Sequence, residues 1–170
     1  MRYEITAPKK FDATIKLPAS KSISNRALVI HALSYGNIMP RHLSDGDDTE
    51  VMVNALRDMP DTIDIKAAGT AMRFLTAYLS VAEGEEHVIT GTERMKHRPI
   101  AILVDALRYL GADISYEGEE GYPPLRIKGK ALEGGHLEIT GSVSSQYISA
   151  LLMIGPALKN GLELKMTGNI

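Results

Sequence analysis

The sequence contains no cysteine, so disulfide bonds, thiolate metal sites and cysteine nucleophiles are excluded. It also lacks a surplus of positive charge, because its formal net charge of −2 differs from the basic balance of a general nucleic-acid binder. No window approaches the ~20 apolar residues of a membrane span, and residues 1–5 lack the apolar stretch of a signal peptide. We therefore expect a cytoplasmic protein that binds neither nucleic acid nor membrane.

The chain does have 170 residues of which 44% are hydrophobic, enough for a sizeable core in one domain. Apolar spacing predicts five helices, over residues 22–34, 48–58, 69–84, 98–110 and 144–158. Nine strands are predicted between them, over residues 2–7, 14–17, 38–42, 62–66, 87–90, 112–116, 125–128, 136–140 and 162–166. This order favours an α/β fold with mixed sheets, in which parallel and antiparallel pairs both occur.

One short pattern recurs: an apolar strand, a turn with Gly, Thr or Ser, and then a helix that opens with polar or cationic residues. Its copies begin near residues 15, 65, 87, 136 and 164. A helix N-terminus presents unpaired N–H groups and about half a positive charge, which suits an anion. Several such ends would together bind a multiply charged substrate. The last copy stops before its helix, so we expect the chain to be a fragment.

The first of these helix starts has the densest polar cluster. On a helix that begins near Ser22, the side chains of Ser22, Asn25 and Arg26 share one face. Lys21 opposes the helix dipole, which indicates a role other than stabilising the helix. The alternative is a capping Ser20 or Ser22 beside solvated cations, and spacing alone does not decide between the two.

The other helix starts carry hydroxyl, amide or cationic groups: Gly69 and Thr70 in the third helix, Arg98 at the end of a basic run in the fourth, and Ser144, Ser145 and Gln146 in the fifth. Each also has a simpler interpretation, namely a Gly–Thr helix start, a solvated basic loop and a double-serine cap. The five histidines show no metal-ligand spacing, and Asp45, Asp47 and Asp48 are better explained as caps of the second helix. We expect no metal site and no cofactor.

Four segments resemble, in order, the signatures of the 5-enolpyruvylshikimate-3-phosphate (EPSP) synthase family: residues 17–28, 68–73, 91–100 and 143–147. Four motifs in the correct order argue strongly against a chance match. The resemblance implies an enolpyruvyl-transferase-like lobe of repeated βαβαββ units, truncated here, with about two units in residues 1–170. It also implies a second, C-terminal lobe that the chain lacks and to which residues 1–15 would belong.

The resemblance further implies a transferase that moves the enolpyruvyl group of phosphoenolpyruvate to the 5-hydroxyl of shikimate 3-phosphate and releases phosphate, a step in chorismate and aromatic amino-acid biosynthesis. It implies these roles: Lys21 is catalytic and contacts both substrates; Ser22 and Arg26 bind the shikimate moiety; Gly69 and Arg98 bind phosphoenolpyruvate; Ser144 and Ser145 bind the shikimate phosphate; Gln146 lies near both ligands. Without its second lobe, the chain alone should be inactive.

Two alternatives compete with this interpretation. UDP-N-acetylglucosamine enolpyruvyl transferase shares the fold, but it lacks the Ser-x-Ser-Asn-Arg pattern and generally has a reactive cysteine, which this chain does not. A non-catalytic module that binds a phosphate ligand is the second alternative, and the sequence leaves it open. One departure from the family pattern is Ala67, where the family commonly has an asparagine.

Overall fold

The computed structural model describes residues 3–4 and 6–168. Its helices are α1 (Lys21–Leu33), α2 (Asp47–Asp58), α3 (Gly69–Val81), α4 (Glu93–Lys96), α5 (Ala101–Tyr109) and α6 (Ser145–Ile154), which a 3₁₀ turn, Gly155–Ala157, extends. Its strands are β1 (Thr62–Asp64), β2 (Glu86–Thr90), β3 (Asp113–Tyr116), β4 (Leu125–Lys128), β5 (Gly135–Thr140) and β6 (Leu162–Thr167). The five predicted helices and six of the predicted strands are confirmed, all with shifted ends except β4, which has the predicted bounds, and α4 is an additional short helix.

The strands form two sheets with mixed pairing, as predicted. The larger sheet has the order β1-β2-β4-β3, in which β1 and β2 are parallel and the β2–β4 and β4–β3 pairs are antiparallel. With α3 and α5 between its strands, this segment is one βαβαββ unit. The parallel pair β5–β6, joined through α6, repeats the first βαβ of that pattern. The number of units in the lobe and the place of residues 1–15 stay predictions.

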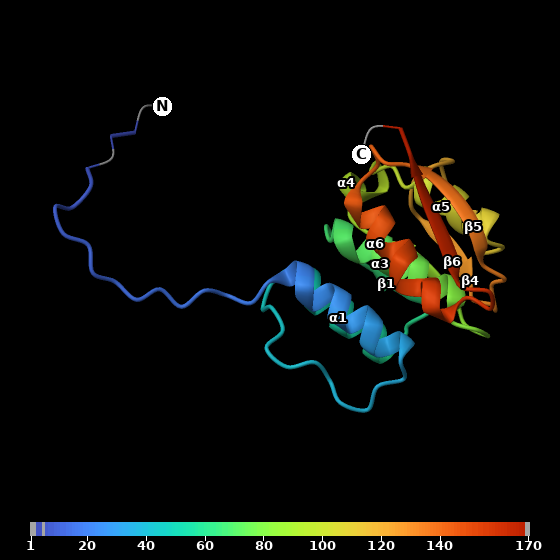
Figure 1. Ribbon diagram of the computed structural model, residues 1–170, viewed down its shortest axis with the longest axis horizontal. Coiled ribbons are helices and arrows are strands. Elements are labelled where there is room, and N and C mark those ends of the chain that lie inside the picture. Colours follow the sequence, from blue (N-terminus) through green and yellow to red (C-terminus); the bar gives the residue numbers. More distant parts are fainter. Residues whose placement is uncertain (1–2, 5, 169–170) are drawn as a thin grey trace.

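Two predicted strands are wrong, and a third lies partly outside the described residues. Residues 14–17 and 38–42 form no strand. The described residues of the 2–7 prediction, 3–4 and 6–7, form none either. Residues 6–20 run away from α1 as an extended tail (Figure 1), where Ile15 and Leu17 are 71% and 80% exposed. Strand-like spacing there finds no partner strand, and Pro40 interrupts the other segment because it cannot donate to a ladder.

Helix α3 is the centre of the molecule and determines where the site forms. It packs against α1, α2, α5 and α6 and against the larger sheet (Figure 1). Most of its residues are buried, including Phe74 and Leu75, both with no exposed surface. Its two buried hydroxyls are satisfied within the helix, since Thr76 and Ser80 each donate to the carbonyl four residues earlier, over 2.7 Å. A helix buried on all sides is held rigidly, and so is its first turn.

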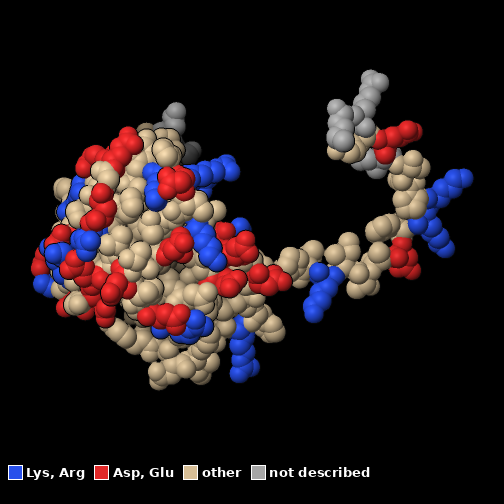
Figure 2. All heavy atoms as spheres, turned by 180° about the vertical axis from the view of Figure 1, so that it is seen from behind, with Lys and Arg blue, Asp and Glu red and all other residues tan. Residues whose placement is uncertain are grey.

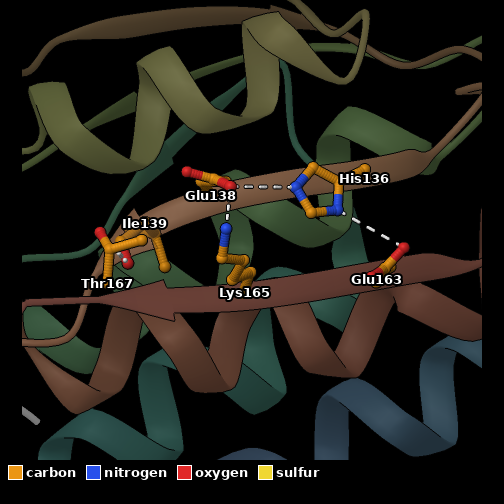
Figure 3. Close-up of polar contacts among 6 residues, drawn as sticks. All are labelled: His136, Glu138, Ile139, Glu163, Lys165 and Thr167. Atoms are coloured by element: carbon orange, nitrogen blue, oxygen red, sulfur yellow. Dashed lines mark hydrogen bonds and ion pairs between the residues drawn. The ribbon is translucent and has the colours of Figure 1, made fainter.

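The small β5–β6 sheet has one polar face and one core face. On the polar face, Lys165 Nζ lies 2.6 Å from Glu138 Oε1, and the His136 ring lies 3.4 Å from both Glu138 and Glu163 (Figure 3). The hydrogen bond from Lys165 is the main cause that lowers the pKa of Glu138. The intervening residues Leu137 and Ile139 are buried. These charged side chains therefore pair with one another on the two strands, and this pairing accounts for their presence.

Charges of both signs are interspersed over the face shown in Figure 2, which displays no extended basic surface. Within the described residues, no helix combines the length and apolar character needed to cross a membrane. Across 3–4 and 6–168, no three His, Asp or Glu side chains are grouped so that they could hold a metal ion. The candidate groups for a binding site are therefore those at the helix N-termini.

Candidate anion-binding site

Helices α1, α3 and α6 begin side by side. At the first turns, Gln146 Nε2 donates to Thr70 Oγ1 over 3.0 Å. One turn further, Arg26 Nη2 donates to Ser149 Oγ over 2.9 Å, and its guanidinium carbon lies 5.2 Å from the centroid of the Phe74 ring. Because each contact joins residues at similar depth in two helices, the three helices run in the same direction (Figure 1). Their positive ends therefore converge on one region.

The start of α1 is built by a serine cap and one ion pair. Ser20 Oγ accepts from the Ile23 amide at 3.4 Å, and Arg26 Nη1 donates to the Ser22 carbonyl at 2.9 Å. Lys21 Nζ lies 3.3 Å from a carboxylate oxygen of Asp48, and the lysine side chain stays 58% exposed. Lys21 and Ser22 are thus accessible at the helix end, and Arg26 is half-buried one turn below them.

Asn25 departs from the expected shared face. It is fully buried, and its Oδ1 accepts from Thr49 Oγ1 of α2 at 2.9 Å, while its Nδ2 has no partner among the described residues. Asn25 therefore fastens α1 to α2, whereas Arg26 faces α3 and α6.

Two guanidinium groups lie against Gly69 at the start of α3. A Cβ at Gly69 would clash with Nη1 of Arg98 and lie 3.0 Å from Nη1 of Arg73. Glycine permits this close approach of the two side-chain ends, and its backbone φ, which is not in the left-handed region, adds no further requirement. Arg73 Nη1 donates to the Gly69 carbonyl at 2.7 Å, and its Nε is buried without a partner among the described residues. Two neighbouring cations with no carboxylate between them form a site that an anion would complete.

The basic run before α5 divides into two kinds of residue. Lys96 binds Glu93 at 2.8 Å, which is the main cause that lowers the pKa of the glutamate, and His97 Nδ1 lies 2.8 Å from the Glu93 carbonyl oxygen. The side chains of Arg94 and Arg98 make no hydrogen bond or ion pair with any described residue. They line a cavity of about 160 Å³ whose wall consists of Ala67, Thr92, Arg94, Met95 and Arg98. Arg94 and Arg98 are both exposed, so the basic run is solvated as the simpler interpretation predicted, and these two arginines also line a hollow.

The start of α6 presents neutral donors. Ser144 is its N-cap and accepts from the Gln146 amide at 3.3 Å, and the Ser144 and Ser145 side chains are exposed. Gln146 is tied to α3 through Thr70. The structure therefore brings the predicted residues of α3 and α6 into one region, with Arg26 of α1 beneath them.

Sequence reasoning missed Arg73 and Tyr147 as parts of this site. Arg73 follows Gly69 by four residues, the same interval that separates Ser22 and Arg26. That repeated spacing was a usable signal, because residues four apart share a helix face. Tyr147 carries no comparable signal in the sequence, since an aromatic residue in a helix is most often a core residue.

The mixed sheets and the βαβαββ pattern define an α/β protein with an enolpyruvyl-transferase-like fold. The family model described as EPSP synthase (3-phosphoshikimate 1-carboxyvinyltransferase) matches residues 5–63 and 58–170. A 3-phosphoshikimate 1-carboxyvinyltransferase of Bacteroides fragilis is 65% identical over the whole chain, which covers 41% of that protein. One of Haemophilus influenzae is 42% identical over 94% of the chain and 43% of that protein. The chain belongs to the EPSP synthase family.

A solved structure gives the same result. The EPSP synthase from Acinetobacter baumannii superimposes with a TM-score of 0.72 at 26% identity, over 85% of this chain and 38% of that one. The chain thus spans about two fifths of the length of the curated relatives it matches. These relatives are 3-phosphoshikimate 1-carboxyvinyltransferases, which supports the main interpretation over the UDP-N-acetylglucosamine alternative.

Proposed function

We propose that this chain is the N-terminal part of a 3-phosphoshikimate 1-carboxyvinyltransferase and supplies half of its substrate site. The observation that carries the proposal is the pair of guanidinium groups at Gly69, without acid partners, beside three convergent helix N-termini. Shikimate 3-phosphate and phosphoenolpyruvate each carry a phosphate and a carboxylate. A site for both must offset several negative charges at once, which this arrangement does.

Shikimate 3-phosphate would bind between α1 and α6. The exposed hydroxyls of Ser144 and Ser145 lie at a helix N-terminus and suit its phosphate. Ser22 and Arg26 would bind the shikimate moiety. The guanidinium of Arg26 has five N–H donors, of which one binds the Ser22 carbonyl and one binds Ser149. The remaining donors can bind a carboxylate.

Phosphoenolpyruvate would bind at the start of α3. Arg98 and the first-turn amides beyond Gly69 would receive its phosphate, beside the cavity lined by Arg94 and Arg98. Lys21 and Gln146 would lie between the two ligands. Gln146 is suited to this because its hydrogen bond to Thr70 already links α6 to α3.

The reaction that follows from this placement has two stages. The 5-hydroxyl of shikimate 3-phosphate loses its proton to a base and its oxygen forms a bond to C2 of phosphoenolpyruvate, while the methylene carbon gains a proton from an acid, which gives a tetrahedral intermediate. The C–O bond to phosphate then breaks and the methyl group loses a proton, which restores the double bond. Arg98 and Lys21 would stabilise the charge on the departing phosphate. The remaining acid–base and phosphoenolpyruvate-binding groups would come from the C-terminal lobe, so this part alone should not turn over.

The test is phosphate release from the two substrates. The isolated chain should release none, and a fusion of the chain to the C-terminal part of the Bacteroides fragilis relative should be active. Arg98→Ala in that fusion should reduce the activity, with the fold checked by circular dichroism. Turnover by the isolated chain would contradict the proposal that it supplies only half of the substrate site. A folded fusion without turnover would contradict the proposed activity, and ligand binding by such a fusion would favour the non-catalytic module. We also propose a cytoplasmic location for the whole protein.

A further inference from the structure

Tyr147 links three elements around Gly69: its own helix α6, the first turns of α3 and the loop that carries Arg98. It lies in the first turn of α6, it is 6% exposed, and its ring packs below the Arg73 guanidinium, with 5.3 Å between the guanidinium carbon and the ring centroid. Its hydroxyl donates to the Pro99 carbonyl at 2.8 Å. One side chain therefore contacts both the cation of α3 and the residue that directly follows Arg98.

The contact at Pro99 fixes the backbone that carries Arg98. The Arg98 amide donates to the Met95 carbonyl at 2.9 Å on one side, and the Tyr147 hydroxyl holds the Pro99 carbonyl on the other. The Arg98 side chain itself makes no hydrogen bond or ion pair with any described residue. Its position against Gly69 therefore depends on the backbone anchors around it, which also include the hydrogen bond from the Ile100 amide to the Gly121 carbonyl at 2.9 Å. A buried hydroxyl requires a partner, so the anchor at Pro99 is also favourable for the tyrosine.

The ring contact keeps Arg73 in place. Arg73 carries a positive charge near a second one, on Arg98, and its Nε is buried without a partner among the described residues. An aromatic face attracts a guanidinium and compensates part of this cost. The ring of Tyr147 thereby stabilises the Arg73 cation together with the hydrogen bond from Arg73 Nη1 to the Gly69 carbonyl.

We propose that Tyr147 is a positioning residue of the anion site, which sets Arg98 and Arg73 on two sides of Gly69 without touching substrate. The expected consequence is a selective loss of phosphoenolpyruvate binding, and this part of the inference rests on the proposed function. Losing the tyrosine hydroxyl should loosen the Arg98 loop and weaken phosphoenolpyruvate binding. The Ser144 and Ser145 hydroxyls should still bind shikimate 3-phosphate.

Amide hydrogen exchange of the 170-residue chain tests the positioning directly. Tyr147→Phe keeps the ring and removes the hydroxyl, and Tyr109→Phe at a 72% exposed position is the matched control. We expect Tyr147→Phe to accelerate exchange of the Arg98 amide about tenfold, the effect of one lost hydrogen bond, with no change at Ile89 and Ile127 in the sheet. Acceleration at all three amides would mean general destabilisation, and no acceleration would mean no anchoring. Either result would overturn the inference.

Steady-state kinetics of the fusion protein test the consequence. We expect Tyr147→Phe to raise the KM for phosphoenolpyruvate about five- to tenfold and to change the KM for shikimate 3-phosphate less than twofold. Tyr147→Leu, which also removes the ring below Arg73, should raise the first KM further. Equal changes in both KM values would overturn the selective role. An unmutated fusion without turnover would count against the proposed function instead, and hydrogen exchange would then decide the positioning alone.

Discussion

Substituting Gly69 by alanine should weaken ligand binding with little change in the free energy of unfolding, because the added Cβ meets only the ends of flexible side chains. Its nearest neighbours are Nη1 of Arg98, with which it would clash, and Nη1 of Arg73 at 3.0 Å, and both are the far ends of long side chains. No backbone strain arises, because the φ of Gly69 is not positive. Alanine also favours a helix over glycine by ~1 kcal/mol, which offsets the displacement. We expect the free energy of unfolding to change by less than about 1 kcal/mol.

The effect on phosphoenolpyruvate should be large. A displaced Arg98 loses a charge-assisted hydrogen bond worth ~1.5–3 kcal/mol, which corresponds to roughly a ten- to hundredfold rise in the KM for this substrate. Urea unfolding of the chain and kinetics of the fusion protein measure the two effects. Gly118→Ala is the matched control, because its Cβ would meet only Pro124, at 3.9 Å. An unchanged KM in a folded Gly69→Ala protein would refute the assignment of Arg98 to this substrate.

Three further substitutions test the packing. Burial raises the pKa of Tyr116 to about 12, and its hydroxyl has no partner in the described part of the chain, so Tyr116→Phe should be neutral or stabilising by ~1 kcal/mol at pH 7. Tyr116 ionises at a lower pH in the unfolded chain than in the folded one, so the free energy of unfolding should fall between about pH 10 and 12. This fall should be smaller in Tyr116→Phe, and an equal fall of the two proteins in urea unfolding would contradict the prediction. The lowered pKa of Glu138 means that its ionised form stabilises the fold at neutral pH, and this stability is lost as the pH falls through that pKa. Lys165→Met should make the thermal melting temperature depend less on acid pH. An unchanged pH dependence would count against a stabilising Glu138–Lys165 pair. Thr49→Val leaves Oδ1 of the buried Asn25 without its donor and should destabilise the chain by ~1–3 kcal/mol in urea, so no loss would mean that the amide finds another partner.

Local periodicity predicted what is local in this fold. The stripes of α2 and α5 depend on residues a few positions apart, so the sequence was sufficient for them. For the cap of α1 the sequence left Ser20 and Ser22 open, and the structure has Ser20. The predicted strand at 14–17 failed because a strand needs a partner, and its alternation says nothing about which strand would pair with it. Ile15 and Leu17 accordingly lie exposed in the tail.

The candidate site likewise has local features that the sequence predicted and long-range contacts that it did not. Its helix starts were predicted from dipole and capping arguments, and the structure places those of α1, α3 and α6 together. Tyr147 could not be predicted, because its role comes from Pro99, 48 residues away, and from Arg73 on another helix. The family resemblance named the residues that would touch ligand, while the residues that hold them in place required the three-dimensional contacts.

Calorimetric titration of shikimate 3-phosphate into the chain, with Arg26→Ala and Arg98→Ala beside it, tests the central claim most directly. The account predicts weak but measurable binding by the unmutated chain, and scarcely any binding of phosphoenolpyruvate. Arg26→Ala should lower the shikimate 3-phosphate affinity roughly ten- to a hundredfold, the effect of one charge-assisted pair. Arg98→Ala should leave it nearly unchanged, because Arg98 lies at Gly69 on the other side of the site. Equal losses from the two substitutions would mean a diffuse basic surface and would contradict the assignment of two separate anion positions.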